Sequence, residues 1–263
     1  MKRILYITLL TVTVALGVSA QSSTNKDGFI RTKDGWEFEL KAGVNFLGGT
    51  APMQMPVEIR AIEGYKPRFG SAVEGVATKW FGTKKGEPEW GISSGLVIEN
   101  RSMQSRARVK NYRTTVPMDN NTEITGHWTG MVEMEYTSTL LSLPVLANYR
   151  FNKDWKARAG LYVGYQLDGK FGGSVYDGYL RNGTPIGPKM ELGEGQQALY
   201  DFTPDMQRWQ WGARVGGSWR AYRHFSVNLD LNWGFSNLFK KSFKAIPFNM
   251  YPIYLQGGFS YQF

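Results

Sequence analysis

The sequence predicts an all-β protein: an eight-stranded, antiparallel, up-and-down β-barrel that crosses a membrane. Three observations support this fold. Apolar and polar residues alternate over long stretches, the connections between these stretches are alternately short and long, and the chain begins with an export signal. Alternation with a period of two places neighbouring side chains on opposite faces of a strand. Transmembrane barrels turn the apolar face towards lipid, carry aromatic girdles at both interfaces and keep polar residues inside.

The N-terminus predicts a cleaved signal peptide at residues 1–20. Lys2 and Arg3 precede an apolar run that ends in small residues before the cleavage site at Ala20. A membrane anchor is the weaker interpretation because the apolar run is short for a span. The chain has no cysteine, which excludes a lipoprotein anchor, disulfides and thiolate chemistry. Residues 21–35 are polar, and we expect them to form a periplasmic lead-in to a barrel domain at residues 36–263.

The alternation divides the barrel domain into eight segments, and it is most regular in the last third of the chain. In the first segment, Trp36 and Phe38 fall on one face, while Glu37 and Glu39 fall on the other. We expect strands at residues 36–46, 67–81, 90–110, 129–151, 155–167, 208–222, 225–236 and 251–263. Pro144 would cost one of these strands a ladder hydrogen bond unless it lies at an irregularity.

The connections between these strands are alternately short and long. We expect short turns at residues 82–89, 152–154 and 223–224, and long loops at residues 48–66, around 120–121, at 168–204 and at 240–248. Bacterial barrels have short periplasmic turns and long extracellular loops. With a periplasmic N-terminus, every short turn falls on the periplasmic side, so the sequence predicts an outer-membrane protein. The charged continuation of the third strand is expected to project beyond the membrane as a hairpin.

Charged residues on the inner face predict a polar lumen network. Its expected members are Glu37, Glu39, Lys41, Glu74, Glu99, Arg101, Arg150, Lys156, Arg158, Arg214, Arg220 and Asp230. The acids gather mainly on the first three strands and the bases on the next three. An eight-stranded barrel is just wide enough for side chains to fill it, and an unpaired buried ion costs several kcal/mol. We therefore expect the charges to pair and plug the lumen; the alternative is that they line a narrow pore or gate.

A run of basic residues is expected at the outer rim, in the hairpin of the third and fourth strands. Its members are Arg106, Arg108, Lys110 and Arg113, with Arg101 below them. Lipopolysaccharide phosphates in the outer leaflet would offer partners for these charges. The alternative is that the loops, including Trp128 and residues 168–204, bind an extracellular ligand or protein, because loops commonly carry function.

Neither an enzyme nor a nucleic-acid-binding protein is favoured. The chain has two histidines: His224 falls in a predicted periplasmic turn, and His127 lies near Asp119, Glu123, Glu133 and Glu135 without a G-x-S-x-G motif. A lipid-modifying barrel enzyme using His127 is the less favoured alternative, and no cofactor or metal is expected. The net charge of +9 could suggest nucleic acid, but the chain combines an export signal with no basic helix and no zinc-ligand spacing.

Five segments carry a family resemblance: LSLPVLANYRF at residues 141–151, AGLYVGY at 159–165, WGARVGG at 211–217, GFSNL at 234–238 and the terminal YQF at 261–263. With these segments the chain resembles the outer-membrane β-barrel proteins of Bacteroidota known as the porin family, of PorT-like type. The resemblance is good over the last half of the chain and loose over the first. It implies the fold and the membrane, and Phe263 resembles the signal read by the barrel-assembly machinery. It also implies, as one possibility, an accessory role in protein secretion. We expect a structural or small-solute pore role, with loop-mediated binding as the alternative.

Overall fold

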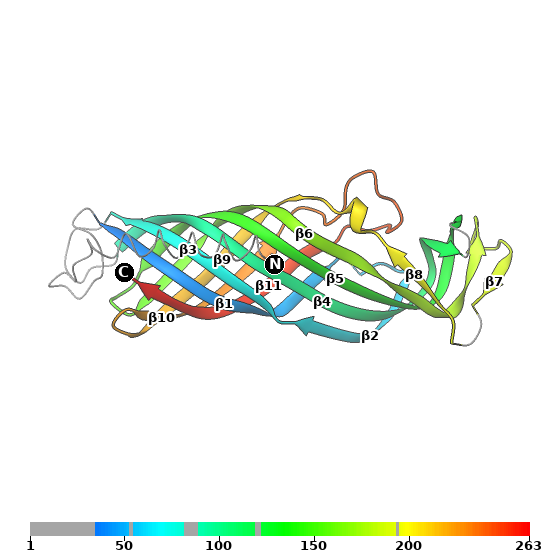
Figure 1. Ribbon diagram of the computed structural model, residues 1–263, viewed down its shortest axis with the longest axis horizontal. Helices are drawn as coiled ribbons and strands as arrows, with labels where there is room; N and C mark the ends of the chain where they lie inside the picture. The colour runs from blue at the N-terminus through cyan, green and yellow to red at the C-terminus, as the bar shows by residue number, and fades with distance from the viewer. Residues whose placement is uncertain (1–34, 53–54, 82–88, 119–121, 193–194) are drawn as a thin grey trace.

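The computed structural model describes residues 35–52, 55–81, 89–118, 122–192 and 195–263. Its strands form an elongated barrel and are tilted against the long axis (Figure 1). Eight strands make the ring, in the order β1 (Trp36–Ala51), β3 (Gly70–Trp80), β4 (Glu89–Met118), β5 (Thr122–Arg150), β6 (Trp155–Asn182), β9 (Trp209–Tyr222), β10 (Phe225–Gly234) and β11 (Tyr251–Gln262). Neighbours pair antiparallel, and β1 pairs with β11 to close the ring. The predicted eight-stranded antiparallel barrel is confirmed.

The faces of the ring strands are those expected of a membrane barrel. In β10, exposed and buried residues alternate without interruption. The exposed positions are apolar, such as Leu229 at 51% exposure, while Asn228 and Asp230 beside it are buried. Aromatic side chains meet at both ends of this apolar surface: Trp155 stacks on Trp219 at one end, and further aromatic pairs lie at the other. Such a surface suits lipid outside and a polar interior.

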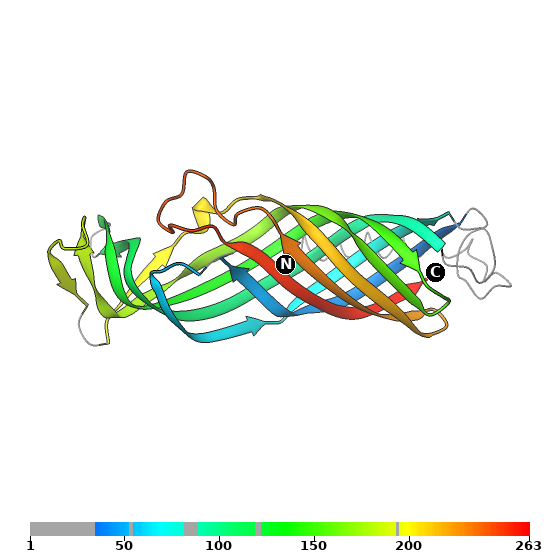
Figure 2. The same cartoon turned by 180° about the vertical axis from the view of Figure 1, so that it is seen from behind.

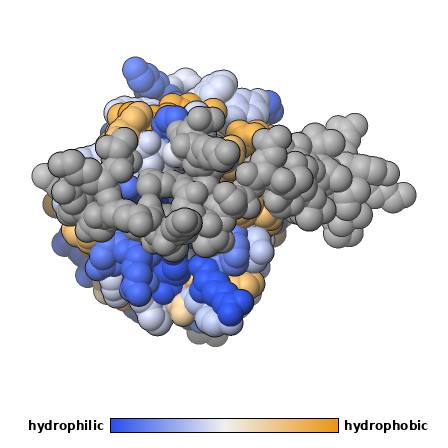
Figure 3. All heavy atoms as spheres, turned by 90° about the vertical axis from the view of Figure 1, so that its left-hand side faces the viewer, coloured by the Kyte–Doolittle hydropathy of each residue, from blue (hydrophilic) through white to orange (hydrophobic). Residues whose placement is uncertain are grey.

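The short connections gather at one end of the barrel. Asn152 Oδ1 accepts hydrogen bonds from the backbone N–H groups of Asp154 and Trp155, which closes the turn between β5 and β6. The turn between β9 and β10 contains Arg223 with a positive φ of 25°. Hydrophilic residues occupy much of the uncovered surface at this end, with hydrophobic residues at its edge (Figure 3). In bacterial barrels this end faces the periplasm, and we call it the periplasmic end.

At the opposite, extracellular end, three strands rise well beyond the rest. The upper parts of β4, β5 and β6 continue pairing, and three additional strands join them: β2 (Ile59–Arg68) on β4, and β7 (Lys189–Glu191) and β8 (Gln197–Asp201) on β6. The short 3₁₀ helix η2 (Thr203–Asp205) follows β8. Both views show this extension projecting from the barrel (Figures 1 and 2).

Because of this extension, several segments that were expected to be loops are strands. Residues 168–182 belong to β6 and not to a loop, residues 59–66 belong to β2, and β5 begins at Thr122 and not near residue 129. The physical reason is that the projecting β4 supplies a pairing edge for both β2 and β5. Bulges also shift the alternation, for example between Thr139 and Leu140, and the outer face there meets water, so apolar residues are no longer required on it.

Two further expectations concern the single residues Pro144 and Glu89. Pro144 lies where the β4–β5 ladder has no pairing, between Ser94↔Val145 and Val97↔Ser142, so its missing N–H falls at an irregularity. Glu89, expected in a turn, is the first residue of β4. The signal peptide and residues 21–34 of the lead-in lie outside the described residues. In the part of the chain that is described, no helix is long and apolar enough to cross a membrane.

Candidate functional site: a polar lumen below an apolar cavity

The lumen network begins with a layer of ion pairs at the periplasmic end. Arg150, at the end of β5, contacts Glu37 and lies 3.0 Å from Glu89. Lys156, at the start of β6, reaches across the ring to β1, where its Nζ lies 2.7 Å from Glu37 Oε1 and also contacts Glu39. Because β1 and β6 lie on opposite sides of the ring, these contacts cross the lumen.

A second layer lies next to the first and adds residues of β3, β9 and β10. Arg158 donates two hydrogen bonds of 2.6 Å to the carboxylate of Asp230. Arg214 bridges Asp230, at 3.0 Å, and Glu74 on the opposite wall, at 2.6 Å. Lys41 Nζ lies 3.5 Å from Glu74 Oε1. These five charged groups form one connected chain across the barrel, and all five are buried.

Arg101 and Glu99 on β4 form the uppermost charged layer. Arg101 Nη2 lies 2.7 Å from Glu99 Oε1, and its guanidinium lies over the rings of Tyr162 and Tyr254. Asn45 donates to the other oxygen of Glu99 at 2.9 Å. The charged part of the lumen therefore ends at these aromatic rings, and the interior above them is apolar.

Of the twelve charged residues that the alternation places in the lumen, ten are buried, and Lys156 and Arg220 are partly buried near the periplasmic mouth. The structure adds Glu89, which is 2% exposed and pairs with Arg150. Sequence reasoning missed Glu89 because it falls at the end of a predicted turn. Odd-numbered residues of this strand, such as Glu99 and Arg101, lie on the inner face. The same parity predicts an inward-facing side chain for Glu89.

The basic run lies on the outside of β4, in the extension. Arg106, Arg108, Lys110 and Arg113 are all exposed. Acids on the neighbouring strands partly neutralise them: Arg108 Nε lies 2.6 Å from Glu63, and Arg106 lies 4.0 Å from Glu133. The rim therefore carries both positive and negative charges.

In the described part of the chain, each of the two histidines lies next to a backbone carbonyl oxygen. His127 Nδ1 lies 3.5 Å from the carbonyl oxygen of Asn111, while Glu133 and Glu135 contact Arg106, Gln104 and Arg68 instead. Asp119 and the side chain of Glu123 lie outside the described residues. His224 Nδ1 lies 2.8 Å from the carbonyl oxygen of Gln262. No group of three or more potential metal-ligating side chains occurs among the described residues.

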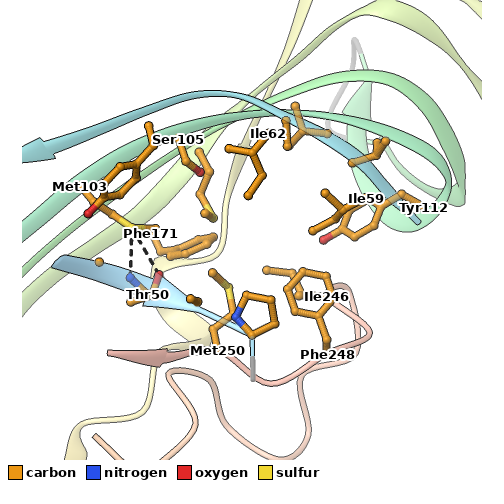
Figure 4. A pocket seen from close by; sticks show the side chains of 18 of the residues that line it. Thr50, Ile59, Ile62, Met103, Ser105, Tyr112, Phe171, Ile246, Phe248 and Met250 are labelled. Carbon is orange, nitrogen blue, oxygen red and sulfur yellow. Dashed lines mark hydrogen bonds between the residues drawn. The ribbon is translucent and has the colours of Figure 1, made fainter. Parts of the chain in front are cut away.

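Above Arg101, the extension encloses an apolar cavity of about 380 Å³. Its wall is the inner face of the five paired strands β2, β4, β5, β6 and β8, and the loop at residues 246–250 lies across the open side. Ile59 and Ile62 of β2 face Ile246, Phe248 and Met250 of that loop across the space (Figure 4). The alternation did not reveal this cavity, because its lining comes from segments far apart in the chain.

The lining of the cavity is almost free of polar groups. Thr50 donates from its N–H and its Oγ1 to the sulfur of Met103, at 3.0 and 3.7 Å (Figure 4). Burial raises the pKa of the Tyr112 and Tyr200 hydroxyls above their ordinary values, so both stay neutral. Among the described residues that line the cavity, none is Asp, Glu, Lys, Arg or His.

A seam in the barrel wall runs beside this cavity. Up to Asn45, β1 pairs with β3 on one side and β11 on the other; from Leu47 to Ala51 it pairs with β11 alone. The strand facing this upper part of β1 is β2, which pairs with β4. The hydroxyl of Tyr65 donates to the carbonyl oxygen of Gly48 across the seam. Both edges of the seam contribute lining residues to the cavity.

A family model described as "Outer membrane protein beta-barrel domain" matches residues 19–240. The chain belongs to this family. Its members are barrels of the outer membrane, which confirms the predicted location and agrees with the lipid-facing exterior and the ring of eight strands. No curated protein matches the chain.

Several solved structures are weakly similar to the chain. Ail, the attachment invasion locus protein of Yersinia pestis, is 10% identical, with 87% of this chain and 97% of that chain covered and a TM-score of 0.34. The outer membrane protein OprG of Pseudomonas aeruginosa is 13% identical, with 88% and 97% covered and a TM-score of 0.34. The translocator domain of the autotransporter NalP of Neisseria meningitidis is 11% identical, with 100% and 97% covered and a TM-score of 0.19. At these scores the similarities carry no argument about function.

Proposed function

We propose that this outer-membrane barrel is a closed, non-catalytic anchor that holds a ligand-binding structure at the cell surface. The observation that carries this proposal is the vertical order of the interior: three layers of paired charges fill the lumen, and an apolar cavity lies directly above them. Of the two roles that the sequence leaves open, this order favours binding by the extracellular part over passage of small solutes.

The ion pairs argue against a pore. A solute crossing the second layer would have to separate Arg214 from Glu74 or Asp230, and removing one partner from a buried pair typically costs about 3–5 kcal/mol. Above the charges, Tyr136 and Phe171 are fully buried and pack in one cluster with Met103. A permeating ion would therefore have to pass an apolar layer as well as a charged one.

The cavity supports binding. Small-molecule sites are mostly apolar hollows of roughly 300–1,000 Å³ with a few polar groups, and this cavity of about 380 Å³ lies within that range. We propose no catalytic role for it, because the residues that line it in the described part of the chain include no Asp, Glu, His, Lys or Arg.

Conductance in planar bilayers tests the closed lumen. We expect no steady current from the purified wild-type protein, nor from Arg158→Ala or Arg214→Ala, because the apolar layer above the ion pairs stays in place. A porin of known conductance in the same bilayers verifies that channels are detected. Steady current through the wild-type barrel would contradict the proposal, whereas current in the variants alone would show that the ion pairs form the seal.

The partners expected from the sequence stay predictions. We propose contact of the outer surface with membrane lipids and of the rim with lipopolysaccharide, although the acids beside Arg106 and Arg108 weaken the attraction for phosphates. Recognition by the barrel-assembly machinery through Phe263 and an accessory role in secretion rest on the family resemblance alone.

A further inference from the structure

We infer that the apolar cavity holds the hydrocarbon tail of a single-chain amphiphile, such as a fatty acid or fatty alcohol, with its polar head at the seam between β1 and β2. The inference rests on the proposed binding function and names the chemical class of its ligand. It also assigns a role to the seam, where the barrel wall is interrupted.

The dimensions of the cavity suit a chain better than a compact ring. Inward-facing lining residues follow β4 from Met103 to Val109, and at about 3.3 Å per residue this distance is about 20 Å. A volume of about 380 Å³ distributed over such a length leaves a narrow space. Two apolar clusters bound it, one with Phe171 and Met250 towards the lumen and one with Trp128 at the distal end.

The chemistry of the lining excludes a buried charged head group. A carboxylate or ammonium inside the cavity would meet no ion-pairing side chain among its described lining residues, and an unpaired charge in such surroundings is strongly unfavourable. The neutral hydroxyls of Tyr112 and Tyr200 offer no charge compensation. The tail therefore belongs inside, and the head belongs where water or head groups can reach it.

The seam is placed to deliver such a molecule from the outer leaflet. At its lower end, Leu47 on β1 and Phe69 between β2 and β3 are exposed by 49% and 79% and continue the lipid-facing surface. At the seam itself, Ile62 and Tyr65 are exposed and also line the cavity. These side chains form an apolar path from the exterior of the barrel into its interior, with the hydroxyl of Tyr65 and the carbonyl of Gly48 at its edge.

Binding of trans-parinaric acid, a linear fluorescent fatty acid, tests the inference on the full-length barrel in amphipols. We expect saturable binding by the wild-type protein. Ala107→Trp, which places an indole in the cavity, should raise Kd by about tenfold or more, a change of about 1.4 kcal/mol. Lys110→Trp adds the same indole to the outside of β4 and should leave Kd unchanged. Circular dichroism verifies that both variants are folded.

Competition defines the ligand class. Dodecan-1-ol and dodecanoate should displace the probe with similar potency because the head stays outside, and toluene should displace it poorly. Unchanged binding by folded Ala107→Trp, absence of saturable binding, or displacement by toluene as effective as by dodecan-1-ol would overturn the inference. The conductance experiment separates the failure of this inference from the failure of the proposed function. A barrel that carries no current and binds no probe contradicts only the proposed ligand class. A barrel that conducts and also binds the probe contradicts only the proposed closed lumen.

Discussion

The membrane part of the barrel and its extracellular extension are built from the same strands, yet their polarities are opposite. On β4 below Arg101, Glu99 is buried inside and Leu96 is exposed outside; above it, Met103 is buried inside and Arg106 is exposed outside. The change takes place within a few residues. It places the outer membrane boundary close to Arg101, because that is the level at which the exterior stops suiting lipid and begins to suit water.

The difference shows how the surroundings determine what holds each part together. Lipid outside requires apolar residues there, and the narrow interior of the membrane part holds a network of paired charges together with a few buried apolar side chains such as Val97 and Leu146. Water outside the extension allows an apolar interior, which is stabilised by about 25 cal/mol per Å² of apolar surface removed from water. Every buried charge in the lumen needs a partner, whereas an apolar interior can contain a cavity without leaving a charge unpaired.

The largest expected effect comes from breaking the lumen network. Asp230→Ala removes the carboxylate that holds Arg158 by two hydrogen bonds and Arg214 by one. Because the buried Arg158 then loses its ion-pair partner and Arg214 keeps only Glu74, we expect the free energy of unfolding to fall by about 3–5 kcal/mol. Urea titration of the protein in liposomes, followed by tryptophan fluorescence, measures this change. A loss below 1 kcal/mol would mean that the lumen charges are solvated and not paired.

A smaller effect is expected at the lipid-facing surface next to Asp230. Leu229→Arg places a charge against lipid near the centre of β10, where such a substitution costs about 2–4 kcal/mol near the bilayer midplane. Asn228→Ala, on the inner face of the same strand, should cost less. The same urea titration compares the two variants. Equal losses at both positions would contradict the assignment of outside and inside.

The comparison also explains which parts of the fold the sequence predicts. In the membrane part, lipid forces alternate residues such as Leu229 and Leu231 to be apolar, so period-two alternation identified all eight ring strands and the faces of residues such as Glu74 and Arg158. In the extension this requirement ends, so the pattern of residues 59–66 and 168–182 predicts loops where the structure has parts of β2 and β6. Which charges pair depends on the order of strands in the ring, and the cavity depends on the meeting of distant segments; neither is encoded locally.

The smallest effect is expected for an ion pair of the same chemistry on the outside of the extension. Arg68 contacts Glu135, and both side chains are more than a third exposed, at 47% and 39%. Exposed pairs contribute about 0–1 kcal/mol because water and salt screen them. We therefore expect Glu135→Ala to change the free energy of unfolding by less than 1 kcal/mol in urea titration, and the change to shrink as salt is added. A loss as large as that of Asp230→Ala would show that the extension, like the lumen, depends on its charges, and would remove the contrast between the two parts.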